Sequence, residues 1–136
     1  MERRIELEEL KRLLAARKYT NIRQFLVELN EADIAFLMEE LEEEEWLKVY
    51  RILPKDLAAD VFSYLEFDSQ EAIITSLSDR EAGSVIDNLM ADDAADFLEE
   101  MPANVVERLL ANANPETRQA VNQLLRYPED SAVMML

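Results

Sequence analysis

Carboxylates are the side chains of this chain whose type and spacing could do chemistry. In the dense acidic cluster of residues 91–100, Asp92 and Asp96 lie four residues apart. That spacing places both on one side of a helix, where they can share a cation or a positively charged partner. Such pairs are more often a cap and a solvated surface, because acids are favoured at helix starts. Asp60 precedes Asp96 by three twelve-residue intervals. Together Asp60, Asp92 and Asp96 favour a weak or shared metal site over a tight one.

Composition limits the other kinds of chemistry. The chain has no cysteine and no histidine, which excludes disulfides, thiolate metal sites and nucleophile–histidine arrangements. A metal ion here would be a hard cation held by carboxylates, such as magnesium or calcium. The formal charge of −16 disfavours binding to nucleic acid and to an anionic membrane surface. No pair of carboxylates lies in a recognisable pocket pattern, so we predict that the chain is not an enzyme.

The elements that must position the acids follow from a twelve-residue repeat. One apolar residue, mostly leucine, recurs at Leu29, Leu41, Leu53, Leu65, Leu77, Leu89, Met101, Ala113 and Leu125. An apolar pair lies four and three residues before most of these positions, for example Val61 and Phe62 before Leu65, which is one face of a helix. Each interval therefore indicates one short helix and a tight turn. We predict an all-α fold, a right-handed superhelix (α-solenoid) of about ten short helices stacked as hairpins.

Local signals mark where these helices begin. We expect a first helix over residues 2–17 and a second over residues 20–29, before the repeat takes over. Prolines suited to the first helical position occur at Pro54 and Pro102. Caps or capping-box pairs are expected at Asn30, at Asp68 with Glu71, at Ser78 with Glu81, and at Asn114 before Pro115.

The first half of the repeat also contains a run of six glutamates in residues 39–45, followed by Trp46. Such charge runs are usually solvated faces, and we interpret this one in that way. Trp46 lies three residues before Val49 and four before Tyr50, on the apolar side of a helix. We therefore predict that Trp46 belongs to the core.

The C-terminal stretch departs from the repeat. Residues 126–130 are expected to break the helix, because Pro128 disfavours helical geometry at the residue before it. The apolar residues that follow resemble the first residues of another domain, so we place one domain at residues 1–126 and a junction at residues 127–136. No apolar run approaches the roughly 18 residues that span a bilayer, and the charged start is not a signal peptide. We expect no direct membrane insertion of this segment.

Three stretches resemble the cytosolic N-terminal domain of the MgtE family of magnesium transporters. They are LPKDLAADVFSYL at residues 53–65, LMADDAADFLEEMP at residues 89–102 and LLRYPEDSA at residues 124–132. The resemblance covers essentially the whole chain, and it implies an α-helical superhelix that precedes a pair of CBS domains and a transmembrane pore. In that family, glycine and then a methionine–threonine pair usually follow the SA of the third stretch, whereas Val133 and Met134 follow it here.

The resemblance also implies a function. Family acids carried over by motif fall on Asp60, Asp92 and Asp96, which would hold Mg²⁺ together with CBS domains of the same full-length chain. Such docking would close the pore of a homodimeric transporter, with this domain on the cytoplasmic face of the membrane. We expect Mg²⁺ to bind weakly to the isolated domain, and other divalent cations are compatible with the same ligands. The alternative is a free-standing α-solenoid adaptor that binds a protein partner, similar to flagellar motor switch proteins.

Overall fold

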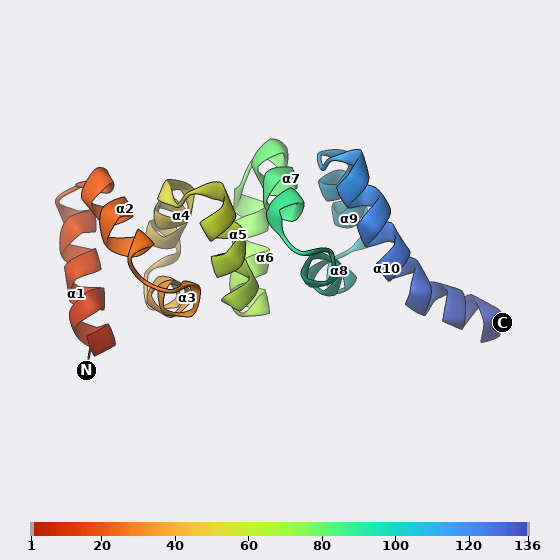
Figure 1. Cartoon of the computed structure of the whole chain (residues 1–136), viewed down its shortest axis with the longest axis horizontal. Helices are drawn as coiled ribbons and strands as arrows, with labels where there is room; N and C mark the ends of the chain where they lie inside the picture. The colour runs from red at the N-terminus through yellow and green to blue at the C-terminus, as the bar shows by residue number, and fades with distance from the viewer. Residues whose placement is uncertain (1, 136) are drawn as a thin grey trace. The chain divides into compact units, whose positions relative to one another are not determined.

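Within residues 2–135, which the computed structural model describes, the chain is all-helical (Figure 1). Side chains are described for residues 4–125. The described part contains ten α-helices and no strand, which confirms the predicted fold class. The helices are α1 (Glu2–Ala15), α2 (Tyr19–Val27), α3 (Glu31–Glu39), α4 (Glu43–Ile52), α5 (Lys55–Tyr64), α6 (Phe67–Ser76), α7 (Asp79–Asn88), α8 (Ala91–Glu99), α9 (Ala103–Ala111) and α10 (Pro115–Met135).

The helices form two compact units, whose boundary in the sequence lies between Ser76 and Leu77. In the first unit α1 packs on α3, α3 on α5, and α2 on α4. In the second unit α7 packs on α9 and α8 on α10. Each of these helices therefore packs on the helix two places along, as expected when short hairpins stack. The handedness of the superhelix stays a prediction.

The twelve-residue repeat builds the core of both units. The members of every apolar pair from Leu37 and Met38 to Leu109 and Leu110 are buried, as the repeat predicts. The leucines that mark the interval lie just beyond the helix ends, except Leu125, which lies inside α10. At Leu41 and Leu53 the backbone N–H donates to the carbonyl three residues earlier, at 3.0 and 3.2 Å. Each such bond tightens the last helical turn and holds the leucine over the core.

Several predicted helix starts are confirmed, and others are shifted. Ser78 and Glu81 form the expected capping box, and Asn30 Oδ1 accepts from the Asp33 N–H at 2.8 Å. Pro54 and Pro102 occupy the N-cap position and not the first helical position, because their ψ angles of 147° and 149° are extended. Asp68 lies inside α6, which begins at Phe67, so the predicted cap at Asp68 is wrong.

Two further caps join residues that are far apart in the sequence. Glu39 at the end of α3 accepts a hydrogen bond from the backbone N–H of Glu66, just before α6, at 3.0 Å. Asp87 near the end of α7 accepts from the backbone N–H of Asn114, just before α10, at 2.8 Å. Both pairs are 27 residues apart, and the second follows the first by four intervals of the repeat. The same kind of side-chain cap therefore occurs in each unit.

The end of α1 is two residues earlier than predicted. Arg17 has a positive φ of 57°. Its N–H donates to the Leu14 carbonyl at 3.1 Å, and the Lys18 N–H donates to the Leu13 carbonyl at 3.0 Å. These two bonds define a Schellman motif, in which glycine usually holds the left-handed position. Residues 16 and 17 therefore cap the helix and do not extend it. The second helix is also shorter than predicted, because it ends at Val27.

Two other predictions are corrected. The helix break expected at residues 126–130 is absent, because α10 continues through Pro128 to Met135. Proline removes one backbone hydrogen bond from a helix but does not forbid one, and its neighbours can carry the helix past it. Trp46 is half-buried and not in the core, because it lies in the first turn of α4, where a surface cavity adjoins it. Across the described residues, no helix has both the length and the apolar character that a membrane span requires.

Candidate functional site

Asp60 lies on the outer side of α5. Its neighbours Ala59 and Val61 are buried, whereas Asp60 itself is exposed. The contrast arises because α5 turns its apolar stripe toward the core, and the sixth residue of the helix falls outside that stripe. Asp60 can therefore present its carboxylate to solvent or to a partner.

Asp92 and Asp96 lie on α8, which belongs to the second unit. Asp96 is the sixth residue of α8, just as Asp60 is the sixth of α5, and Asp92 lies one turn earlier. Both are exposed, while the intervening Ala94 and Ala95 are buried. Asp92 is in the first turn, where the helix dipole stabilises a negative charge, but Met90 and not Asp92 is the N-cap residue. Like charges four residues apart repel each other, so the pair favours a shared cation.

The structure reveals one acid that the sequence analysis did not single out. Asp56 precedes Asp60 by one turn on α5 and is also exposed. One of its carboxylate oxygens accepts from the neighbouring Leu57 N–H at 3.0 Å. The signal was present in the sequence, because Asp56 to Asp60 and Asp92 to Asp96 share the pattern D-x-A-A-D. Each unit therefore carries one pair of exposed carboxylates with helical spacing.

Within residues 4–125, no basic side chain pairs with the three predicted ligands. Among the described residues, Asp60, Asp92 and Asp96 form neither a salt bridge nor a side-chain hydrogen bond. In the second unit Arg108 instead pairs with Asp79 at 3.2 Å, and Arg118 donates to the Leu110 and Ala113 carbonyls at the end of α9.

The net charge of each unit agrees with this lack of compensation. The first unit has 18 acids and 10 bases, and the second has 12 acids and 4 bases, so each has a formal charge of −8. Both units therefore attract cations.

The arrangement supplies oxygen ligands of the kind that magnesium prefers. Among the described side chains, no group of three or more acids lies close enough to hold a metal ion. The structure brings Asp92 and Asp96 to one face of α8, while Asp60 belongs to the other unit. The chain can thus offer carboxylates in pairs, and a full coordination shell would need water or a partner.

Comparisons with known proteins agree with the fold and the motifs. The family model described as the MgtE intracellular N domain matches residues 29–130, about three quarters of the chain. The magnesium transporter MgtE of Bacillus subtilis is 30% identical over 91% of this chain and 28% of its own length. The magnesium transporter MgtE of Thermus thermophilus is 35% identical over 82% of this chain and 25% of its own length. The chain thus spans about a quarter of these curated relatives.

Solved structures support the same relationship. One structure of the cytosolic domain of the Mg²⁺ channel MgtE, in complex with ATP, is 30% identical and matches with a TM-score of 0.77. That match covers 89% of this chain and 50% of the other. The soluble part of a magnesium transporter matches with a TM-score of 0.84 at 18% identity, over 92% of this chain and 50% of the other, and it supports the fold alone. The family match, the curated relatives and the shared fold together show that the chain belongs to the family of MgtE intracellular N domains.

Proposed function

We propose that this chain is the regulatory, magnesium-sensing domain of a magnesium transporter. The observation that carries the proposal is the set of exposed, uncompensated carboxylates at Asp60, Asp92 and Asp96, on a chain that belongs to the MgtE N-domain family. Exposed acids without basic partners are available to a cation, whereas acids in salt bridges are not. The role is binding and regulation, not catalysis.

In this proposal the domain docks on CBS domains of the same full-length chain through shared divalent ions. Two surfaces of negative charge repel each other, and Mg²⁺ bound between them replaces that repulsion by attraction. Magnesium keeps several waters and needs only one or two carboxylates from each side. Asp92 and Asp96 would supply one such pair, and Asp60 would supply a separate carboxylate.

Docking would then regulate transport. If magnesium binds the docked arrangement more tightly than the open one, a rise in its concentration shifts the population toward the docked state. In a homodimeric transporter whose N domains lie on the cytoplasmic face of the membrane, that shift would close the pore. The domain would in this way report the intracellular magnesium level.

The experiment that tests the proposal is calorimetric titration of the isolated chain with magnesium chloride. Because the chain supplies only part of each coordination shell, we expect weak binding, with a dissociation constant of about a millimolar or above. The variant Asp92→Asn/Asp96→Asn should lose part of the heat, whereas Glu107→Gln/Glu116→Gln, with the same change of charge, should not. A sodium chloride titration at equal ionic strength separates binding from screening. A tight, stoichiometric site on the chain alone would contradict the sharing of ligands.

A further inference from the structure

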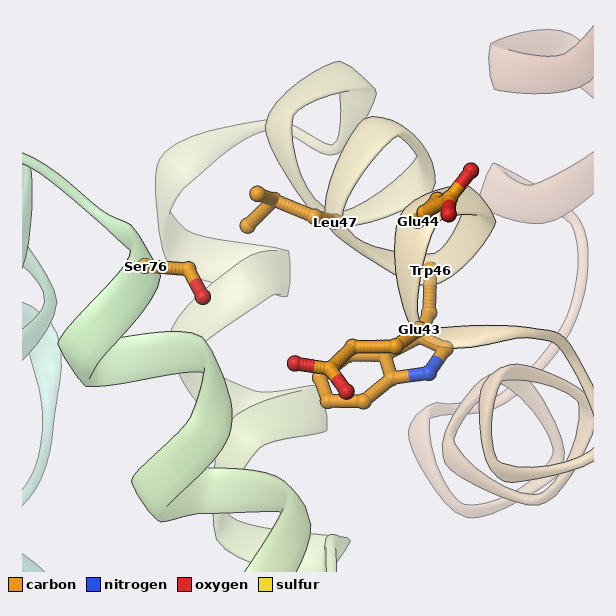
Figure 2. A pocket seen from close by; sticks show the side chains of 5 residues that line it. All are labelled: Glu43, Glu44, Trp46, Leu47 and Ser76. Atoms are coloured by element: carbon orange, nitrogen blue, oxygen red, sulfur yellow. The ribbon is translucent and has the colours of Figure 1, made fainter.

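A cavity on the first unit combines groups that no part of the proposed magnesium site uses. It has a volume of about 320 Å³ and is lined by Glu43, Glu44, Trp46 and Leu47 of α4 and by Ser76 of α6 (Figure 2). Figure 2 shows the Leu47 and Ser76 side chains directed toward one another across the cavity, from the two helices. The lining thus brings together the Glu43 carboxylate, an indole, an aliphatic side chain and a hydroxyl, whereas the Glu44 carboxylate points away from the other four side chains in Figure 2.

The indole of Trp46 is the unusual part of this lining. Trp46 lies on the same helical stripe as the buried residues Val49 and Tyr50, but it is only half-buried. An indole that keeps part of its surface in water can stack against a group of a partner. The preference of helix N-termini for acids explains why Glu43 and Glu44 lie in the first turn of α4. That preference does not explain an accessible indole beside them.

The carboxylates in the cavity are available to a ligand. Among the described residues, Glu43 and Glu44 form no salt bridge, and both are exposed. A cation that reaches the cavity would meet the negative charge of Glu43 and the indole of Trp46, the aromatic ring that attracts cations most strongly.

These groups match the side chain of arginine. A guanidinium is planar, stacks on an indole and bonds a carboxylate with two parallel N–H groups. The Ser76 hydroxyl can accept a further N–H, and Leu47 can pack against the aliphatic stem. We propose that this cavity binds an arginine side chain presented by a partner protein.

Two observations favour a protein partner over a free small molecule. The cavity volume is at the lower end of the range of small-ligand pockets, about 300–1,000 Å³, and three of the five lining residues are exposed. A free ligand would therefore stay largely open to water, whereas a docked protein would cover the cavity with its own surface. The formal charge of −8 on this unit would in addition steer a basic partner surface toward it.

The test uses the fluorescence of Trp46, which is the one tryptophan of the chain. The wild-type chain is titrated with the capped peptide acetyl-Gly-Arg-Gly-amide and with the same peptide containing citrulline, a neutral isostere of arginine. We expect a saturable change in emission with the arginine peptide and binding about tenfold weaker with citrulline. This comparison needs no variant and so does not depend on the folding of one.

A pair of variants then locates the site. Glu43→Gln should weaken binding of the arginine peptide by about tenfold. Glu45→Gln is the matched control, because Glu45 lies in the same helical turn but does not line the cavity, and it should change the affinity by less than about twofold.

Three results would overturn the proposal. The first is the absence of a saturable change with the arginine peptide, or equal binding of the citrulline peptide. The second is a loss of affinity in Glu45→Gln as large as that in Glu43→Gln, which would indicate general charge attraction. The third is tighter binding of free arginine than of the capped peptide, which would indicate a site for small cations. The opposite order is expected, because the carboxylate of free arginine would be repelled by Glu43 and Glu44.

Discussion

Replacement of Gly83 by alanine tests how closely α7 and α9 approach each other. A Cβ atom at Gly83 would lie 2.3 Å from the carbonyl oxygen of Asn112 and 2.7 Å from its carbonyl carbon. Ordinary contacts of a Cβ atom begin near 3.4 Å. Because the opposing atoms belong to the backbone at the end of α9, the helices themselves must separate by roughly 1 Å. Overpacking of this kind costs about 1–3 kcal/mol.

Alanine also favours the helix over glycine by about 1 kcal/mol, which offsets part of that cost. An overlap this large with backbone atoms belongs to the upper part of the overpacking range, about 2–3 kcal/mol. We therefore expect Gly83→Ala to lower the free energy of unfolding by about 1–2 kcal/mol and the melting temperature by roughly 3–10 °C. Urea unfolding and thermal melts followed by circular dichroism measure both quantities. The control is Ser84→Ala, which gains helix propensity without the clash and should not be destabilised. A Gly83→Ala protein as stable as the wild type would refute the close approach.

Three further predictions concern stability and use the same assays. Arg17→Gly should raise the free energy of unfolding by up to about 1 kcal/mol, because a φ of 57° costs a non-glycine residue about that much. Arg17→Ala should not raise it, because alanine meets the same cost. Asp87→Ala should lower it by about 0.5–2 kcal/mol through loss of the cap on Asn114, and Asp87→Asn should lower it less because an acceptor remains. Tyr50→Phe should raise it by about 1 kcal/mol, since the buried Tyr50 hydroxyl has no hydrogen-bond partner among the described residues. Burial raises the pKa of Tyr50 above its ordinary value of 10.0. The wild type should therefore lose stability as the pH rises above that value, and Tyr50→Phe should lose less. Equal losses of stability in the two proteins would contradict this prediction.

The features that could be predicted from the sequence are those with local causes. The burial of Val61 and Phe62 follows from their spacing along one helix, and the Ser78 and Glu81 capping box spans only four residues. The cap of Asn114 by Asp87 could not be predicted, because its partners are 27 residues apart and meet only when the helices stack. The exposure of Trp46 has the same cause, since it depends on what the neighbouring helices leave uncovered.

The candidate site shows the same division. The exposed positions of Asp60, Asp92 and Asp96 follow from helical periodicity, and the structure agrees with them. Asp56 was missed, although it repeats the spacing of Asp92, because a single acid beside a proline and a lysine resembles an ordinary helix start. A coordination shell completed by another domain has no local signature at all, so no pattern within this chain could specify it.

Affinity for the CBS domains as a function of magnesium tests the central claim most directly. The dissociation constant between this chain and the CBS domain pair of the proposed full-length transporter would be measured at micromolar and at millimolar magnesium, at equal ionic strength. Magnesium should tighten binding by about tenfold or more. Asp60→Asn/Asp92→Asn/Asp96→Asn should abolish that gain, whereas Glu28→Gln/Glu107→Gln/Glu116→Gln, with the same change of charge, should keep it. An affinity that does not depend on magnesium, or a gain that survives in the aspartate variant, would contradict the account.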